Sequence, residues 1–216
     1  MMRKRFTMST LISVDLSQRL GVSPERIRAS PAPGTATVED AIEIHDREGV
    51  LCELVEGVLV EKAMGYSEST IGGVMFAILY AFVLPRNLGI VSAADGTVEL
   101  MPGLVRIPDV AFANWDRVPG GRHPTAPAPA VAPNLAVEVL SRSNTPREMA
   151  LKRRDYFAAG VELVWELDPT GRTVAVYTSP TAMRTLTATD TLDGGTVLPG
   201  FEVVVGDVFA ELDRHR

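Results

Sequence analysis

Two acidic residues interrupt apolar segments of this chain, and a lysine follows them on the next segment. Asp109 lies within VRIPDVAF (105–112), and Glu138 lies within LAVEVL (135–140). Both segments have the composition of buried strands. A buried carboxylate costs several kcal/mol unless a cation or hydrogen-bond donors compensate its charge. The sequence therefore raises the question of what compensates these two carboxylates.

The lysine is Lys152, on a helix that the sequence predicts over residues 144–160. Both ends of this helix carry residues that are typical of helix caps, namely Thr145, Pro146, Glu148 and Gly160. Met149, Lys152 and Tyr156 are spaced three and four residues apart, so they share one face. We therefore expect Lys152 to point inward beside a methionine and a tyrosine.

These residue types together favour metal-assisted phosphate chemistry. Two carboxylates about 5 Å apart repel each other by roughly 3 kcal/mol at an effective dielectric constant of about 20. A divalent cation removes this conflict, and Mg²⁺ is commonly held by one or two carboxylates and several waters. A nearby ammonium can orient water and stabilise a phosphate under attack. Taken singly, each residue also has a structural explanation, such as a strand end, a solvent-facing strand or a lysine that extends to solvent.

The elements that must position these residues follow from the pattern of the chain. A helix is predicted from Thr37 to Gly49, a hairpin over 50–62 and a largely buried helix from Ser67 or Ser69 to Pro85. The remaining segments predict strands around a loop over 117–133 and the helix over 144–160. The strands are 89–101 with a turn at Asp95-Gly96, 105–112, 134–141, 161–169, 172–179, 184–192 and 194–209, which begins with a turn. This order predicts an α/β fold of the α+β kind, with a central mixed sheet flanked by helices.

Composition limits the classes of protein that this chain can belong to. The 216 residues suit one domain, which we place at 37–216 after an N-terminal arm or linker at 1–36. Cys52 is the only cysteine, which excludes disulfides and thiolate zinc sites and suggests a cytoplasmic protein. The sequence has no run of about 18 apolar residues, so it predicts no membrane-spanning helix. The net charge of −6 argues against strong nonspecific DNA binding but permits a local basic cleft.

Five segments in order resemble the Uma family of endonucleases, which is assigned to the restriction-endonuclease-like PD-(D/E)XK fold. They are CELVEGVLVE, VRIPDVAF, NLAVEVLSRSNT, KRRDYFAAGVELVWELDP and LDGGTVLPGFEVVVGDVF. The resemblance spans residues 37–212, which is most of the chain. It implies a restriction-endonuclease-like core with a metal-dependent phosphodiesterase site.

The resemblance also implies roles for individual residues. Asp109 and Glu138 match the acidic residues of the family, which would bind Mg²⁺ or Mn²⁺, with the backbone carbonyl of Val139 close to the ion. The lysine usually found two residues after the second acid is replaced by Leu140. Lys152 matches a lysine on the following helix that takes this role.

Two further positions follow from the resemblance. Glu53 matches an acidic member of the site that would bind a second metal or orient the lysine. Members of the family often carry a histidine at the start of the long helix, where this chain has Ser67, Glu68 and Ser69 instead. This departure keeps a second hypothesis open.

Our leading hypothesis is a Mg²⁺-dependent endonuclease that hydrolyses nucleic acid, with DNA as the expected substrate. The alternative is a catalytically inactive module on the same fold that binds nucleic acid or protein. A hydrolase that acts on other phosphodiesters is a third possibility. We also expect a homodimer, because restriction-type folds often pair two protomers to cut two strands. The apolar helix or the N-terminal arm would supply the interface.

Overall fold

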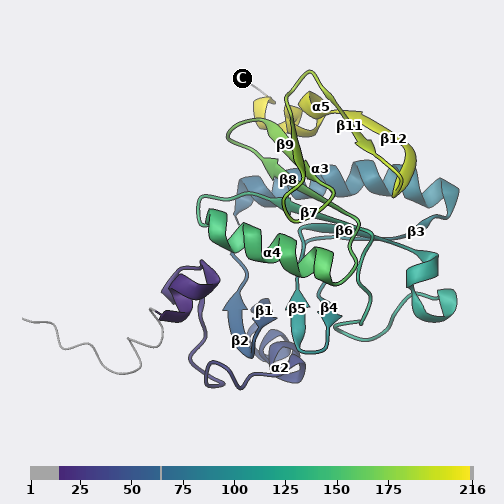
Figure 1. Cartoon of the computed structure of the whole chain (residues 1–216). Helices are drawn as coiled ribbons and strands as arrows, with labels where there is room; N and C mark the ends of the chain where they lie inside the picture. The colour runs from purple at the N-terminus through teal and green to yellow at the C-terminus, as the bar shows by residue number, and fades with distance from the viewer. Residues whose placement is uncertain (1–14, 64, 215–216) are drawn as a thin grey trace, which may run out of the picture.

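The computed structural model describes residues 15–63 and 65–214, whose strands form three sheets (Figure 1). The strand order is β2-β1-β5-β4 in the first sheet, β10-β9-β8-β7-β6-β3 in the second and β11-β12 in the third. The strands are β1 (Cys52–Val55), β2 (Val58–Glu61), β3 (Gly89–Ser92), β4 (Val98–Met101), β5 (Leu104–Arg106), β6 (Val110–Asn114), β7 (Leu135–Val139), β8 (Leu163–Asp168), β9 (Thr173–Tyr177), β10 (Met183–Leu186), β11 (Thr191–Gly194) and β12 (Leu198–Val204). The α-helices are α2 (Val38–Glu48), α3 (Tyr66–Val83), α4 (Pro146–Ala158) and α5 (Val205–Phe209).

The six-stranded sheet is mixed, as the sequence predicts. Strands β7 and β8 run parallel, while the other neighbours in this sheet pair antiparallel. A parallel pair needs a crossover connection, and α4 supplies it between β7 and β8. The fold is therefore a central mixed sheet with helices on its faces, as the sequence predicts.

The alternation of side chains along β7 determines where Glu138 points. Val137 and Val139 pack in the same hydrophobic cluster as residues of α3. Ala136 lies on the opposite face, in a cluster with Tyr156 of α4. Because successive side chains of a strand point to opposite faces, Glu138 shares the face of Ala136 and is directed toward α4.

The segment VRIPDVAF is two strands and not the single strand that we predicted. It begins as β5 in the four-stranded sheet and continues as β6 in the six-stranded sheet. Ile107, Pro108 and Asp109 form the link between them. Proline has no backbone N–H to continue a ladder, whereas the N–H of Asp109 donates to the carbonyl of Val137 at 2.9 Å. Asp109 therefore lies at the junction of two sheets.

Other strand predictions also differ from the structure in part. The predicted strand over 184–192 is divided between β10 and β11, because a turn intervenes in which Asp190 accepts bonds from the backbone and hydroxyl of Thr187. The turn predicted at Asp95-Gly96 is present, but the halves of 89–101 on its two sides, β3 and β4, lie in different sheets.

Helix α3 is less buried than its apolar composition predicts. Its buried residues form one stripe, which includes Ile71, Met75 and Leu79, against the six-stranded sheet. The outer face is exposed at Tyr80, and Leu84, directly after the helix, extends this exposed surface. By length and composition alone the segment Tyr66–Arg86 could cross a membrane, since an 18-residue window within it has a mean hydropathy of 1.6, but core helices of soluble proteins have the same properties.

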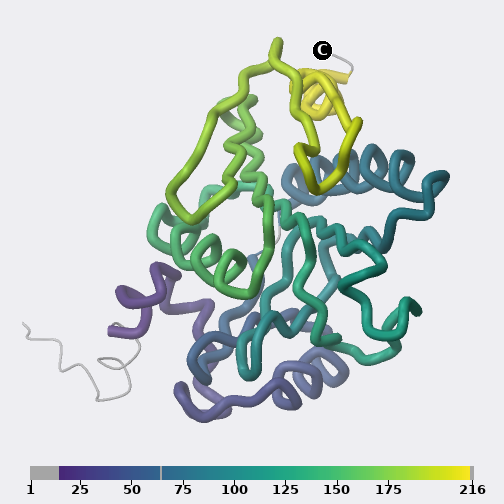
Figure 2. Tube along the Cα trace, turned by 45° about the vertical axis from the view of Figure 1, so that its right-hand side comes forward, coloured from purple at the N-terminus to yellow at the C-terminus, as the bar shows by residue number. Residues whose placement is uncertain are grey.

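The described part of the predicted N-terminal arm packs against the rest of the protein. Residues 15–20 are helical, and Leu16, Leu20 and Val22 join a hydrophobic cluster with residues of the β1–β2 hairpin. Ile27 forms a bridge with Val60 of β2. Figure 2 shows this segment in purple beside α4 in green. Residues 1–14 of the predicted arm lie outside the described part of the chain.

Candidate active site

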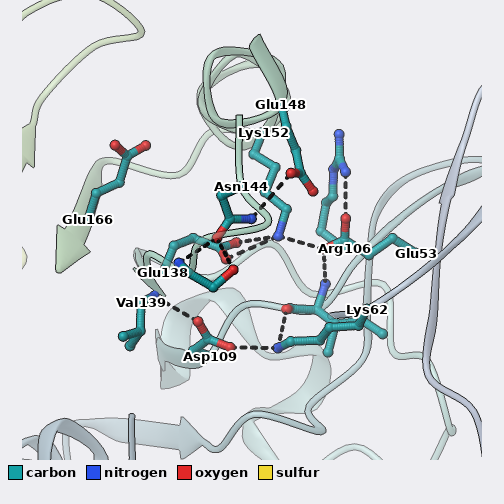
Figure 3. A network of polar contacts seen from close by, with 12 residues as sticks. Glu53, Lys62, Arg106, Asp109, Glu138, Val139, Asn144, Glu148, Lys152 and Glu166 are labelled. Atoms are coloured by element: carbon teal, nitrogen blue, oxygen red, sulfur yellow. Dashed lines mark hydrogen bonds and ion pairs between the residues drawn. The ribbon is translucent and has the colours of Figure 1, made fainter. Parts of the chain in front are cut away.

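Glu138 and Lys152 form the centre of a buried polar cluster (Figure 3). The ammonium of Lys152 lies 3.1 and 3.0 Å from the two carboxylate oxygens of Glu138. Lys152 Nζ also lies 2.9 Å from Glu53 Oε1. All three side chains are almost completely buried. The structure therefore brings together three of the four residues that the sequence singled out as catalytic candidates.

The surroundings of Glu138 raise the pKa of its carboxyl group to about 7. Burial is the largest cause, and Lys152 offsets it only in part, because the negative charges of Asp109 and Glu53 also disfavour ionisation. The hydroxyl of Tyr156 donates to Glu138 Oε1 at 2.5 Å. Glu138 thus lies in a place where more positive charge would stabilise its ionised form.

Glu53 is held by two cations and lies deeper than Glu138. Arg106 Nη1 donates to Glu53 Oε2 at 2.7 Å, and Arg106 Nη2 donates to Asp155 at 2.5 Å. Burial alone would raise the pKa of Glu53, but Lys152 and Arg106 outweigh it and lower that pKa to about 2. Glu53 is therefore a permanent anion that anchors Lys152.

Asp109, the fourth candidate, faces the same cluster from the junction of the two sheets. Its Oδ1 lies 2.9 Å from Lys62 Nζ, and its Oδ2 accepts the N–H of Val139 at 2.7 Å. Lys62 also donates to the carbonyls of Ala94 and Ile107, at 2.9 and 2.7 Å. Its three ammonium protons are thus all engaged. The cation that compensates Asp109 is Lys62, which the sequence had not identified.

Asp109, Glu138 and Lys152 line one small cavity of about 30 Å³. Room for one water needs roughly 10–15 Å³, so the cavity can hold a water or an ion. It adjoins a cleft of about 840 Å³, and the two share Ala63, Gly65, Glu68 and Ser141. A ligand in the cleft would therefore lie next to the cavity that contains the carboxylates.

The donor set fits a hard cation of the Mg²⁺ type. Two carboxylates with water completing the shell is a usual arrangement for this ion, and the raised pKa of Glu138 marks a deficit of positive charge. Among residues 15–63 and 65–214, no three His, Cys, Asp or Glu side chains are grouped as metal ligands. Any ion here would rest on Asp109 and Glu138. Val139 contacts Asp109 through its amide, and the role of its carbonyl stays a prediction.

The start of α3 supplies polar residues where the family often has histidine. Glu68 and Ser69 line the small cavity, and Ser67 lines the adjoining cleft. A carboxylate and hydroxyls therefore occupy this edge. Neither can act as a neutral imidazole base.

Three residues at the site escaped the sequence analysis, namely Arg26, Lys62 and Asn144. All three line the small cavity. Lys62 directly follows an apolar hairpin strand, which is the one local signal that could have indicated it. Arg26 and Asn144 lie in segments without periodicity, so only the tertiary structure identifies them.

Comparison with known proteins now identifies the family. The sequence model of the Uma2 family, described as "Putative restriction endonuclease", matches residues 38–207. The chain belongs to the Uma2 family. The family and the fold expected from the five sequence segments are therefore confirmed. A search of curated proteins finds no match to this sequence.

A solved structure supports the fold of this Uma2 protein. It is a crystal structure from Anabaena variabilis ATCC 29413, described as a "putative nuclease belonging to DUF820". The two chains superpose with a TM-score of 0.67 at 19% identity, over 75% of this chain and 91% of the other. At this level of identity the similarity concerns the fold.

Proposed function

We propose that this Uma2 chain is a metal-dependent endonuclease that hydrolyses phosphodiester bonds in nucleic acid. The observation that carries the proposal is the cavity shared by Asp109, Glu138 and Lys152, which adjoins the large cleft. A hard cation, a water and a phosphate oxygen can meet only where such groups converge.

Asp109 and Glu138 would hold Mg²⁺ or Mn²⁺, assisted by the carbonyl of Val139. Bound there, the metal supplies Lewis-acid stabilisation of the negative charge on the phosphate. Although burial favours its neutral form, Glu138 and Glu53 outweigh burial and raise the pKa of Lys152. Lys152 therefore stays protonated near neutral pH, and its proposed role is to orient water and stabilise charge. Glu53 would hold that ammonium in place.

The cleft is the proposed binding place for the substrate. Arg142 and Arg172 line it together with hydroxyls of Ser141, Ser143 and Thr170. Arginine and hydroxyl donors are the usual partners of phosphate oxygens in nucleic-acid complexes. We propose DNA as the substrate, bound locally at this cleft, since the whole chain is acidic.

One observation favours a second candidate, a binding module without cleavage activity. Lys62 already neutralises Asp109, and Lys152 already contacts Glu138. If these pairs are permanent, no metal enters. Calorimetric titration separates the two candidates, because the nuclease binds Mg²⁺ or Mn²⁺ at millimolar concentration and the binding module does not.

A homodimer is also part of the proposal, since restriction-type folds often pair two protomers to cut the two strands of a duplex. The exposed outer face of α3, with Tyr80 and Leu84, is the proposed interface. Size-exclusion chromatography with light scattering tests it. A dimer is expected for the natural protein and a monomer for Leu84→Glu, whereas a monomeric natural protein would contradict this interface.

Cleavage tests the enzymatic proposal. Plasmid and single-stranded DNA are incubated with Mg²⁺ or Mn²⁺ and one form of the protein. The forms compared are the natural protein and the variants Asp109→Asn and Glu138→Gln. The matched control is Glu166→Gln, because Glu166 is the buried register partner of Glu138 on β8 but pairs with Arg153 instead. Metal-dependent cleavage should persist in the control and disappear in the other two variants. Equal activity in all three variants would refute the assignment.

A further inference from the structure

The N-terminal segment 15–28 lies outside the family match at 38–207 and yet reaches the candidate site. Arg26 lines the same cavity as the two carboxylates proposed to bind metal. Its side chain is only 11% exposed. We infer, on the basis of the proposed function, that Arg26 is a positioning residue that fixes the two site lysines relative to each other.

Arg26 connects the two elements that carry those lysines. Its Nε donates to the carbonyl of Glu61 at 2.8 Å, directly before Lys62. Its Nη1 donates to Glu148 Oε1 at 2.8 Å, one helical turn before Lys152 on α4. The donors of a guanidinium have a fixed geometry, so one side chain sets the separation of both elements.

Glu148 passes this constraint to the loop after β7. Its Oε2 accepts a bond from Asn144 Nδ2 at 3.2 Å. Asn144 Oδ1 in turn accepts from the backbone N–H of Ser141 at 2.8 Å and from its hydroxyl at 3.0 Å. Ser141 lines both the cavity and the cleft. A continuous chain of bonds therefore leads from Arg26 to the mouth of the site.

The side chain of Glu148 makes these contacts instead of the helix-capping bond that its position favours. Thr145 and Glu148 have the spacing of a capping box, but only the bond from the N–H of Glu148 to the hydroxyl of Thr145 is present. A buried acid withdrawn from its own helix cap and paired with a residue 122 positions away indicates a tertiary function.

Other contacts hold the segment in place independently of Arg26. The hydroxyl of Thr145 donates to the carbonyl of Gly21, and Arg147 donates to the carbonyl of Arg19. Gly21 has a φ of +70°, and a Cβ there would lie 2.6 Å from the backbone nitrogen of Glu148. The close approach requires glycine. A substitution of Arg26 should therefore loosen the site without detaching the segment.

The test is the full-length double variant Arg26→Met with Glu148→Gln. Glutamine keeps an acceptor for Asn144 and leaves no unpaired buried charge, so the fold should survive. For DNA cleavage we expect kcat to fall by about tenfold or more with KM within about twofold of the natural value. The single variant Arg26→Lys should also have a lowered kcat, because one ammonium cannot make the two divergent hydrogen bonds of the guanidinium. A kcat within about twofold of the natural protein would overturn the inference.

A second measurement does not depend on activity. Amide hydrogen exchange should accelerate by about tenfold or more at 60–62 and 141–152 in the double variant, while β9 keeps its natural rate. Arg19→Met, which removes an exposed pair with Glu56, is the matched control and should leave exchange unchanged. Unaltered exchange in the double variant would overturn the positioning role. If exchange is faster in the double variant but the natural protein does not cleave DNA, the proposed nuclease function is rejected and the positioning role of Arg26 is kept.

Discussion

Lys62 Nζ lies 2.9 Å from Asp109 Oδ1, with side chains that are 6% and 16% exposed. These residues belong to different segments, since Lys62 follows β2 and Asp109 links two sheets. Their contact answers the question raised by an acid among apolar residues: a lysine from the hairpin compensates it. The same contact closes one face of the carboxylate that is proposed to bind metal. Whether Lys62 and a metal ion replace each other beside Asp109 can therefore be tested directly.

Replacement of Lys62 by methionine should destabilise the metal-free protein. Loss of one partner from a buried pair leaves an uncompensated charge, which typically costs about 3–5 kcal/mol. Urea denaturation measures this loss. Added Mg²⁺ should restore part of the stability, because it replaces the missing positive charge beside Asp109. The double variant Lys62→Met with Asp109→Asn is the control and should show no restoration by Mg²⁺. Equal restoration in both variants would argue against a metal at Asp109.

Metal binding should release protons near neutral pH. Glu138 has a pKa raised to about 7 chiefly by burial, and its ionised form is the metal ligand. Affinity for Mg²⁺ should therefore rise between pH 6 and 8. Calorimetry at pH 7 in two buffers of different ionisation enthalpy should detect release of about half a proton per ion. Glu166→Gln should behave like the natural protein, and Glu138→Gln should lose this pH dependence. Binding without proton release would contradict the proposed role of Glu138.

Stability of the metal-free protein should fall as pH rises through the titration of Glu138. Its pKa is raised from 4.5 in an exposed state to about 7 in the folded protein. The folded state therefore binds more protons than the unfolded state across this window, so stability is lost as pH increases from about 4.5 to 7. The comparison is between natural protein and Glu138→Gln by denaturant unfolding at each pH. If the free energy of unfolding changed with pH at the same slope in both proteins, titration of Glu138 would not be linked to stability.

Replacement of Arg106 should also strongly lower the free energy of unfolding. It neutralises both Glu53 and Asp155, so Arg106→Met should cost about 3–5 kcal/mol of unfolding free energy. Arg47→Met is the control, because Arg47 forms an exposed pair with Glu43 that contributes about 0–1 kcal/mol. Similar losses in the two variants, measured in urea, would show that the buried network contributes little.

Local patterns explain which parts of the site the sequence could predict. Alternation along β7 places Glu138 on one face, and three- and four-residue spacing places Lys152 and Tyr156 on one face of α4. These two periodicities are properties of single elements. The facing pair of Glu138 and Lys152 follows once the helix crosses from β7 to β8, which the strand–helix–strand order indicates.

The remaining parts depend on contacts between distant segments. Arg26 and Glu148 are 122 positions apart, and no local pattern links them. The division of VRIPDVAF into β5 and β6 was missed because both halves are apolar and only Pro108 marks the break. The exposed face of α3 was missed because its composition is apolar on all sides.

The most direct test of the central claim is the position of a metal in crystals grown with Mn²⁺. Anomalous scattering locates this ion without reference to activity. The account predicts one peak in the small cavity, at about 2.1 Å from a carboxylate oxygen of both Asp109 and Glu138, with Lys62 displaced from Asp109. Crystals at millimolar Mn²⁺ with no peak there, and with Lys62 still paired to Asp109, would contradict it.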